Sequence, residues 1–205
     1  MTQIPAEAAG DRPGVLAIGN AAAGSAAEEA LGEAMVALRE LADVELVVPA
    51  DLDELRAALE VAGRRRVVVL GGDGSLHATV GALDALGTLD AGPVGVVPLG
   101  TGNDLARAIG IPLDPAEAAR VALTGVPRRL DLLRADDGSV VVNAVHAGIG
   151  AEAALRAGDH KGALGAAAYA LGAVRAGARE RGWRLRVTVD GETVHDGTEP
   201  VIMVA

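Results

Sequence analysis

The sequence of 205 residues contains no cysteine and no phenylalanine, and only one tyrosine, one tryptophan and one lysine. The absence of cysteine excludes a disulfide framework, a thiolate metal site and a cysteine nucleophile. Arginine, alanine and glycine are abundant, which is typical of a GC-rich bacterial genome and needs no functional explanation. Because half of the residues are hydrophobic, the chain can bury a core, and that core must be aliphatic.

Long apolar runs are also missing, and none approaches the roughly 20 residues that a membrane-spanning helix needs. The residues near Met1 do not resemble a signal peptide, so we expect a cytoplasmic protein, with peripheral contact to a membrane left open. The net charge of −10 argues against general nucleic-acid binding. Between Arg156 and Arg186, however, seven basic residues face two acidic ones. This segment is either a solvated helix face or a surface for an anionic lipid or nucleotide.

Strand-like and helix-like segments alternate after a small, polar tail at residues 1–12. This alternation predicts an α/β domain over residues 13–127, with an open parallel sheet and helices on both of its faces. The expected strands are residues 15–18, 44–48, 66–70 and 94–97, and the expected helices are residues 26–41, 52–62, 75–86, 104–109 and 115–123.

The pattern changes near Pro127, and residues 128–205 are predicted to form a second, β-rich domain. An antiparallel hairpin is expected from residues 130–134 and 140–145 around the turn at Asp136 to Ser139. A helix at 162–181 and strands at 184–189 and 201–205 follow. Because the last strand meets no turn signal, we expect this domain to be partial in the chain. An unpaired apolar edge also leaves a homodimer open.

Three small-residue turns each follow an expected strand and precede an expected helix. Two are glycine-rich, Gly71-Gly72-Asp73-Gly74-Ser75 and Gly100-Thr101-Gly102-Asn103-Asp104, and the third runs from Gly19 to Ser25. Glycine lets backbone amides approach an anion, and a helix N-terminus adds donors and a favourable dipole. The spacing fits neither a P-loop nor a dinucleotide fingerprint. The turns therefore predict a nucleotide phosphate site of another kind.

These residues resemble the diacylglycerol kinase catalytic family, which includes bacterial lipid kinases. The first turn matches the signature GGDG[TS], and residues 98–107 match P-x-GTxNDxAR. The resemblance implies a Rossmann-like N-terminal domain and a β-sandwich C-terminal domain. It also implies an ATP- and Mg²⁺-dependent kinase that phosphorylates the hydroxyl of a diacylglycerol-like lipid at the membrane surface.

The resemblance also assigns expected roles to individual residues. Asp73 is expected to hold Mg²⁺ through water or to act as a base, while the metal ligands themselves stay unknown. The nucleotide would be bordered by Asn20 and Gly24, its phosphates cradled by the amides of Gly71, Gly72, Asp73, Gly74 and Ser75, and the site closed by Thr101, Gly102 and Asn103.

Departures from the family pattern keep alternatives open. Relatives usually carry a glutamate at the position of Ala78, and their general base is a carboxylate late in the second domain. An NAD kinase-like enzyme shares the GGDG motif, although the second motif argues against it. A nucleotide-binding module without catalysis is the other alternative.

Several of the site residues also have simpler structural interpretations. Asp73 could instead bond the amides of its own turn. Asn103 and Asp104 are expected to cap the helix that follows them. Arg107 either pairs with a carboxylate or reaches toward phosphate, and the sequence does not decide between the two.

Overall fold

The computed structural model describes residues 12–20, 25–148, 182–199 and 201–204. By its contacts the chain divides into two compact units, Met1–Asn143 and Ala144–Ala205. The expected helix at 162–181 and the site residue Gly24 lie outside the described residues. The first unit extends beyond residue 127, where the sequence pattern placed the end of the first domain. The predicted domain limits, 13–127 and 128–205, stay a prediction.

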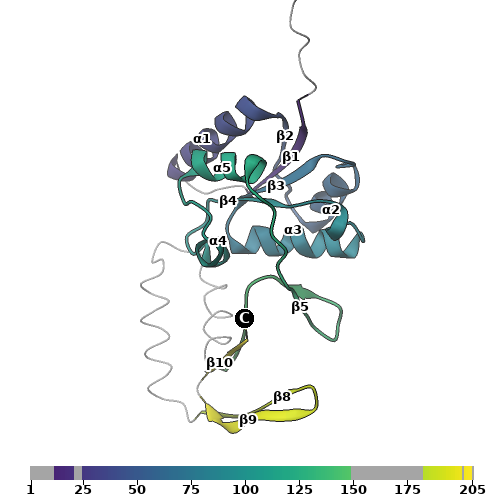
Figure 1. The fold of residues 1–205 in the computed structure, drawn as a ribbon, viewed down its shortest axis with the longest axis vertical. Coiled ribbons are helices and arrows are strands. Elements are labelled where there is room, and N and C mark those ends of the chain that lie inside the picture. Colours follow the sequence, from purple (N-terminus) through teal and green to yellow (C-terminus); the bar gives the residue numbers. More distant parts are fainter. Residues whose placement is uncertain (1–11, 21–24, 149–181, 200, 205) are drawn as a thin grey trace, which may run out of the picture. The chain divides into compact units, whose positions relative to one another are not determined.

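A four-stranded sheet in the order β2-β1-β3-β4 forms the centre of the first unit, and all of its neighbouring strands are parallel (Figure 1). The predicted open parallel sheet is therefore confirmed. Its strands are β1 (Gly14–Gly19), β2 (Asp43–Val47), β3 (Arg66–Gly71) and β4 (Gly95–Pro98).

The register of the sheet brings the carboxyl ends of three strands level with one another. At the last paired positions, Gly19 of β1 lies opposite Leu70 of β3, and Gly71 of β3 lies opposite Pro98 of β4. The turns that follow β1, β3 and β4 therefore start side by side, at the edge of the sheet where open α/β folds bind their ligands.

Helices cover both faces of the sheet because its central strands are apolar on both sides. In β1, Val15 and Ala17 pack toward α1 and α5, whereas Leu16 and Ile18 belong to the core beneath α2 and α3. Such continuous apolar strands are typical of parallel sheets buried on both faces. The helices are α1 (Ser25–Leu41), α2 (Leu52–Glu60), α3 (Asp73–Ala85), the 3-10 turn η1 (Leu89–Ala91), α4 (Asp104–Ile109) and α5 (Pro115–Thr124).

A short hairpin, β5 (Leu133–Arg134) with β6 (Val140–Val141), packs against α3 at the end of the first unit. Val140 is buried in a cluster with Leu76 and Val80 of α3. The antiparallel hairpin was predicted, but a continuous strand over residues 140–145 is wrong. The chain bends after Val141, and β7 (Val145–Gly148) belongs to the second unit.

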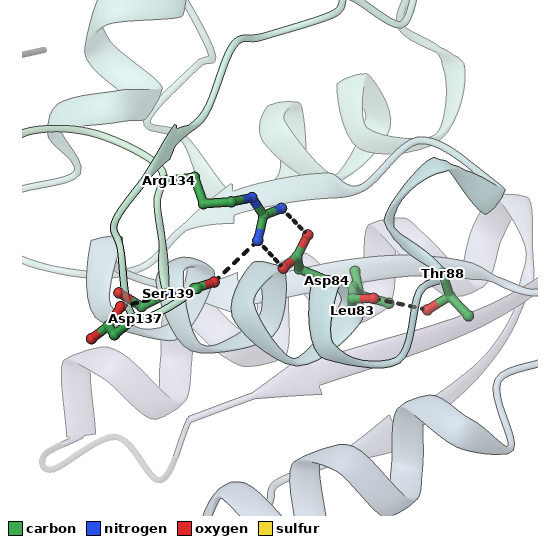
Figure 2. A network of polar contacts seen from close by, with 7 residues as sticks. Leu83, Asp84, Thr88, Arg134, Asp137 and Ser139 are labelled. Carbon is green, nitrogen blue, oxygen red and sulfur yellow. Dashed lines mark hydrogen bonds and ion pairs between the residues drawn. The ribbon is translucent and has the colours of Figure 1, made fainter.

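An ion pair fastens this hairpin to the C-terminal half of α3 (Figure 2). The Arg134 guanidinium donates to both carboxylate oxygens of Asp84, at 2.9 and 2.7 Å, and also to the Gly138 carbonyl at 3.0 Å. Hydrogen bonding from Arg134 lowers the pKa of Asp84, and the same bond raises the pKa of Arg134. Two parallel bonds of this type fix geometry as well as charge.

The described part of the second unit is made of antiparallel strands, in agreement with the predicted β-rich region. β7 pairs with β10 (Val201–Val204), so the expected edge strand has a partner. β8 (Trp183–Val189) pairs with β9 (Glu192–Glu199) across a turn in which Asp190 and Gly191 both have positive φ, 50° and 85°. Two such residues are what a tight two-residue hairpin requires. Among the described residues, no helix is long and apolar enough to cross a membrane.

Candidate functional site

The first glycine turn leads directly from β3 into α3. Gly72 is the N-cap residue of the helix and offers no side chain, so no side-chain hydrogen bond caps α3. The first intrahelical bond of this turn runs from the Leu76 amide to the Gly72 carbonyl at 3.1 Å. The amides of the preceding residues, Asp73, Gly74 and Ser75, are the donors that a helix N-terminus leaves without an intrahelical acceptor.

Gly71 and Gly74 need to be glycines for different reasons. A Cβ atom at Gly71 would lie 2.6 Å from the Ser75 hydroxyl oxygen, so the fold itself excludes a larger residue. A Cβ atom at Gly74 would meet nothing within 4 Å, and the backbone there does not require a positive φ. Glycine inside a helix costs about 0.5–1 kcal/mol relative to alanine. The described part of the chain gives no structural reason for glycine at position 74.

The second glycine turn is held from within by Asn103. This residue is 6% exposed and adopts the left-handed conformation, with φ 53°. Its Oδ1 accepts from the Gly100 amide at 3.0 Å, and its Nδ2 donates to the carbonyls of Pro98 at 3.3 Å and Gly100 at 2.6 Å. Asn103 occupies the N-cap position of α4, but its side chain makes no cap bond. The predicted capping by the Asn103 side chain is therefore wrong.

The cap of α4 comes instead from the first turn. The Asp73 carboxylate accepts from the Asp104 amide at 3.1 Å and from the Leu105 amide at 3.2 Å. The alternative in which Asp73 bonds the amides of its own turn does not hold, because both of these bonds cross to the second turn. Asp73 thus ties the two glycine turns together, and its expected role toward Mg²⁺ or as a base stays a prediction.

Backbone contact also presses the two turns against each other. A Cβ atom at Gly100 would lie 2.5 Å from the Cα atom of Gly72, and one at Gly72 would lie 3.0 Å from the Cα atom of Gly100. The Leu99 amide donates to the Gly71 carbonyl at 3.0 Å and extends the β3–β4 pairing into the turns. Only glycine permits two backbones to approach this closely.

The turn after β1 contributes Asn20 to the same edge. Asn20 is exposed, and its Cβ atom lies 4.0 Å from the position that a Cβ atom would take at Gly71. The structure therefore brings Asn20 beside the first glycine turn, while Thr101 and Gly102 lie exposed on the second.

Two carboxylates face the exposed backbone of Gly102. The space that a Cβ atom would fill there lies 3.3 Å from Oδ2 of Asp73 and 3.8 Å from both carboxylate oxygens of Asp104. Sequence reasoning treated Asp104 only as a helix cap, although its position after the motif asparagine was the available signal. Among the described residues, no three histidine or carboxylate side chains gather in a way that could hold a metal ion.

Ala78 lies one turn into α3, where the resemblance expects a glutamate. It is partly buried and packs against the apolar cluster that contains Leu16, Ile18 and Leu83. No carboxylate reaches the turns from this position.

An open parallel sheet with three small-residue turns at its carboxyl edge defines an α/β domain of the kind that binds nucleotides or phosphorylated ligands. The family model of the diacylglycerol kinase catalytic domain matches residues 14–135, which span the whole sheet and all three turns. The chain belongs to this family.

Bacterial relatives agree with this assignment. A "Probable lipid kinase YegS-like" of Chromohalobacter salexigens is 38% identical over 122 residues, which are 58% of this chain and 39% of the relative. A protein of the same description from Pseudomonas aeruginosa strain UCBPP-PA14 is 42% identical over 111 residues, 54% of this chain and 35% of the relative. The matched segment thus spans little more than a third of these curated relatives.

Solved structures share the fold. A crystal structure of a diacylglycerol kinase from Bacillus anthracis str. Sterne superimposes with a TM-score of 0.70 at 22% identity. The superposition covers 94% of this chain and 63% of that chain. It supports both the α/β unit and the antiparallel region that follows.

Proposed function

We propose that this chain binds ATP at the glycine turns, as part of a lipid kinase that transfers the terminal phosphoryl group to the hydroxyl of a diacylglycerol-like lipid. Membership of the diacylglycerol kinase catalytic family supports the reaction class. The observation that carries the proposal is the N-terminus of α3, where the N-cap residue Gly72 makes no side-chain cap bond and the space at Gly74 is open.

Each turn has a separate part in nucleotide binding. The amides of Asp73, Gly74 and Ser75 donate to phosphate oxygens, and the dipole of α3 adds to the attraction. Asn20 and Thr101 border the nucleotide from the neighbouring turns. Phosphoryl transfer depends mainly on positioning and charge stabilisation, and dense backbone donors on a rigid sheet supply both.

The oxygen atoms near Gly102 fit the Mg²⁺ that accompanies ATP. Mg²⁺ prefers oxygen ligands and usually keeps several waters, so two carboxylates are sufficient partners. Asp73 and Asp104, whose carboxylates both lie beside Gly102, would hold the ion directly or through water. When bound, it would neutralise charge on the phosphate oxygens.

Because the proposed substrate is a membrane lipid, the protein would act at a membrane surface, as a peripheral protein on the cytoplasmic side. The relatives described as lipid kinases support a lipid acceptor. A homodimer stays a prediction that size measurements in solution would test.

Ala78 favours one second candidate, a nucleotide-binding module without catalysis. The expected glutamate is replaced by a side chain packed into the core. Under this candidate Mg-ATP binds in the same way, but no phosphate reaches a lipid.

The test compares two identical substitutions in one helix, Gly74→Ala and Gly81→Ala. A Cβ atom meets nothing within 4 Å at either position, so both variants keep or gain stability in thermal unfolding. Gly74→Ala fills the space over the α3 N-terminus and weakens Mg-ATP binding at least about tenfold by calorimetric titration, equivalent to about 1.4 kcal/mol. Gly81→Ala leaves the affinity unchanged. Equal affinities of the two variants, or no binding by the wild type, would contradict the proposal.

Transfer of radiolabelled phosphate from ATP to diacylglycerol vesicles then separates the two candidates. Labelled lipid is expected for the kinase. Tight ATP binding without labelled lipid would support the module without catalysis.

A further inference from the structure

The three turns of the site contain no basic side chain. Residues 19–25, 71–75 and 100–104 include neither lysine nor arginine. A nucleoside triphosphate brings several negative charges to this edge, and Asp73 and Asp104 add two more beside Gly102. A P-loop meets the same demand with a lysine inside the loop itself. Here, a cation has to reach the turns from outside them.

Arg107 is placed to meet that need. It lies in the last turn of the short helix α4, and its Nε donates to the Gly102 carbonyl at 3.0 Å. Side chains on a helix point back toward its N-terminus, which is why Arg107 can reach the turn that precedes α4. The bond fixes the guanidinium beside the exposed backbone of the second glycine turn.

Among the described residues, most of the donors of the Arg107 guanidinium have no partner. An arginine fork has five N–H donors, and the bond to Gly102 uses the one on Nε. Within residues 12–20, 25–148, 182–199 and 201–204, Nη1 and Nη2 of Arg107 have no hydrogen-bond acceptor, and no carboxylate lies within 4.0 Å to form an ion pair. The side chain is exposed, so an anion can approach it.

Two other arginines of the first unit, Arg66 and Arg134, make their hydrogen bonds away from the turns. Arg66 donates to the carbonyls of Ala122 and Leu123 at the end of α5, and Arg134 is paired with Asp84. In the described part of the chain, Arg107 is the basic side chain that bonds a glycine turn.

We propose that Arg107 binds the polyphosphate of the nucleoside triphosphate through its Nη donors, while its Nε bond to Gly102 holds the guanidinium in place. This inference rests on the proposed nucleotide binding and adds the cationic group that the turns lack. A planar guanidinium can contact two phosphate oxygens at once, and its fixed position reduces the entropy lost on binding. Arg107 thereby takes the second of the two roles that the sequence left open.

The experiment measures Mg-ATP and adenosine affinities of the wild type, Arg107→Gln, Arg107→Lys and the control Arg120→Gln. Arg120 is also exposed on a helix, and its nearest carboxylate is Glu40 at 3.7 Å, so the control changes the net charge equally without touching the turns. We expect Arg107→Gln to weaken Mg-ATP binding at least about tenfold and Arg107→Lys to weaken it less. Arg120→Gln should leave the Mg-ATP affinity unchanged. Adenosine, followed by ligand-observed NMR, should bind all four proteins alike because it carries no phosphate.

The outcomes separate this inference from the proposed function. If the wild type does not bind Mg-ATP, the proposed function fails and takes the role of Arg107 with it. If the wild type binds and Arg107→Gln matches Arg120→Gln, only the role of Arg107 is overturned. If both Arg107 variants bind Mg-ATP and adenosine more weakly by the same factor, the proposed role of Arg107 is also overturned, because the residue would then act only by shaping the turn.

Discussion

The two glycine turns look equivalent in sequence, yet they differ in where their hydrogen bonds go. The first turn ends in a helix without a side-chain cap, so the amides at the start of α3 remain available. In the second turn the side chain of Asn103 accepts from the Gly100 amide, and the helix after the turn is capped by Asp73. The first turn is therefore built to present donors, whereas the second is built as a rigid support for it.

The comparison teaches that a glycine motif next to a helix does not by itself identify a phosphate-binding amide. Buried backbone groups find partners within the protein wherever they can. At the second turn Asn103 accepts from the Gly100 amide and Asp73 from the amides of Asp104 and Leu105, so these three amides are not available to a ligand. The exposed side chains of Thr101 and Arg107 are. Two substitutions would break or sharpen this division, and a third tests a contact of the first unit that lies away from both turns.

Gly100→Ala should have the largest effect, because it forces the support away from the first turn. The new Cβ atom would lie 2.5 Å from the Gly72 Cα atom and 2.8 Å from Oδ1 of Asn103, and backbone cannot move aside easily. We expect a loss of about 3 kcal/mol in the free energy of unfolding, measured with urea, and weakened Mg-ATP binding. Gly92→Ala is the control, because a Cβ atom there meets nothing within 4 Å and φ is 179°. If both variants unfold alike, the two turns are not pressed together as described.

Asp73→Ala should have an intermediate effect, since it removes the cap of α4 and the link between the turns. Loss of a capping carboxylate costs about 1 kcal/mol in the free energy of unfolding. Asp73→Asn keeps one acceptor oxygen and should lose less. The matched control is Asp51→Ala, which removes the cap of α2, where the carboxylate accepts from the amides of Asp53 and Glu54 at 3.0 and 2.9 Å.

Stability and binding should separate in this pair of variants. Asp51→Ala and Asp73→Ala are expected to lose similar stability, but only Asp73→Ala should weaken Mg-ATP binding. An Asp73→Ala protein with wild-type stability would show that the carboxylate does not hold α4.

Asp84→Asn should have the smallest effect, one that appears mainly in the pH dependence of stability. Arg134 lowers the pKa of Asp84 in the folded protein, so the ion pair contributes stability above the pKa of an unfolded aspartate, about 4. This contribution disappears as the pH falls through the lower, folded-state pKa. Urea unfolding between pH 7 and about pH 2 should therefore show a smaller acid loss for Asp84→Asn than for the wild type.

The matched control for Asp84→Asn is Asp90→Asn, which removes a second ion pair to an arginine. Its partner is Arg129 at 3.8 Å, and both side chains are 97% exposed. Exposed pairs contribute little to stability, so this variant should follow the wild-type pH curve. An Asp84→Asn curve identical to that of Asp90→Asn would show that the hairpin is not fastened to α3 by Arg134. Mg-ATP affinity should be the same in both variants, because neither residue lies at the turns.

The strands, helices and parallel order were predictable because they follow from local patterns. The alternation of apolar segments and turn residues predicted the four strands of the first unit, and the helices around them, to within a few residues. The short connections between strands and helices predicted that the sheet is parallel. The position of the turns at one edge follows from that topology, without any long-range information.

The division of roles between the turns could not be predicted, because it depends on contacts between residues far apart in sequence. The partners of Asp73 are 31 and 32 residues away, and nothing local distinguishes them from the amides of its own turn. Asn103 likewise has the residue type and position of a helix cap, but its left-handed backbone directs the amide group back to Pro98 and Gly100. The bend after Val141 was missed because the apolar pattern of residues 140–145 does not reveal it.

The bonds from Asp73 also provide a built-in spectroscopic sensor. The amides of Asp104 and Leu105 donate to its carboxylate, so their chemical shifts in a ¹H–¹⁵N correlation spectrum report changes in the position and bonding of that carboxylate. If Mg²⁺ draws Asp73 toward itself, these two signals move together, whereas a nucleotide that contacts only the amides of α3 leaves them in place. The arrival of the metal and the arrival of the nucleotide could thus be followed separately, without a probe attached to either turn.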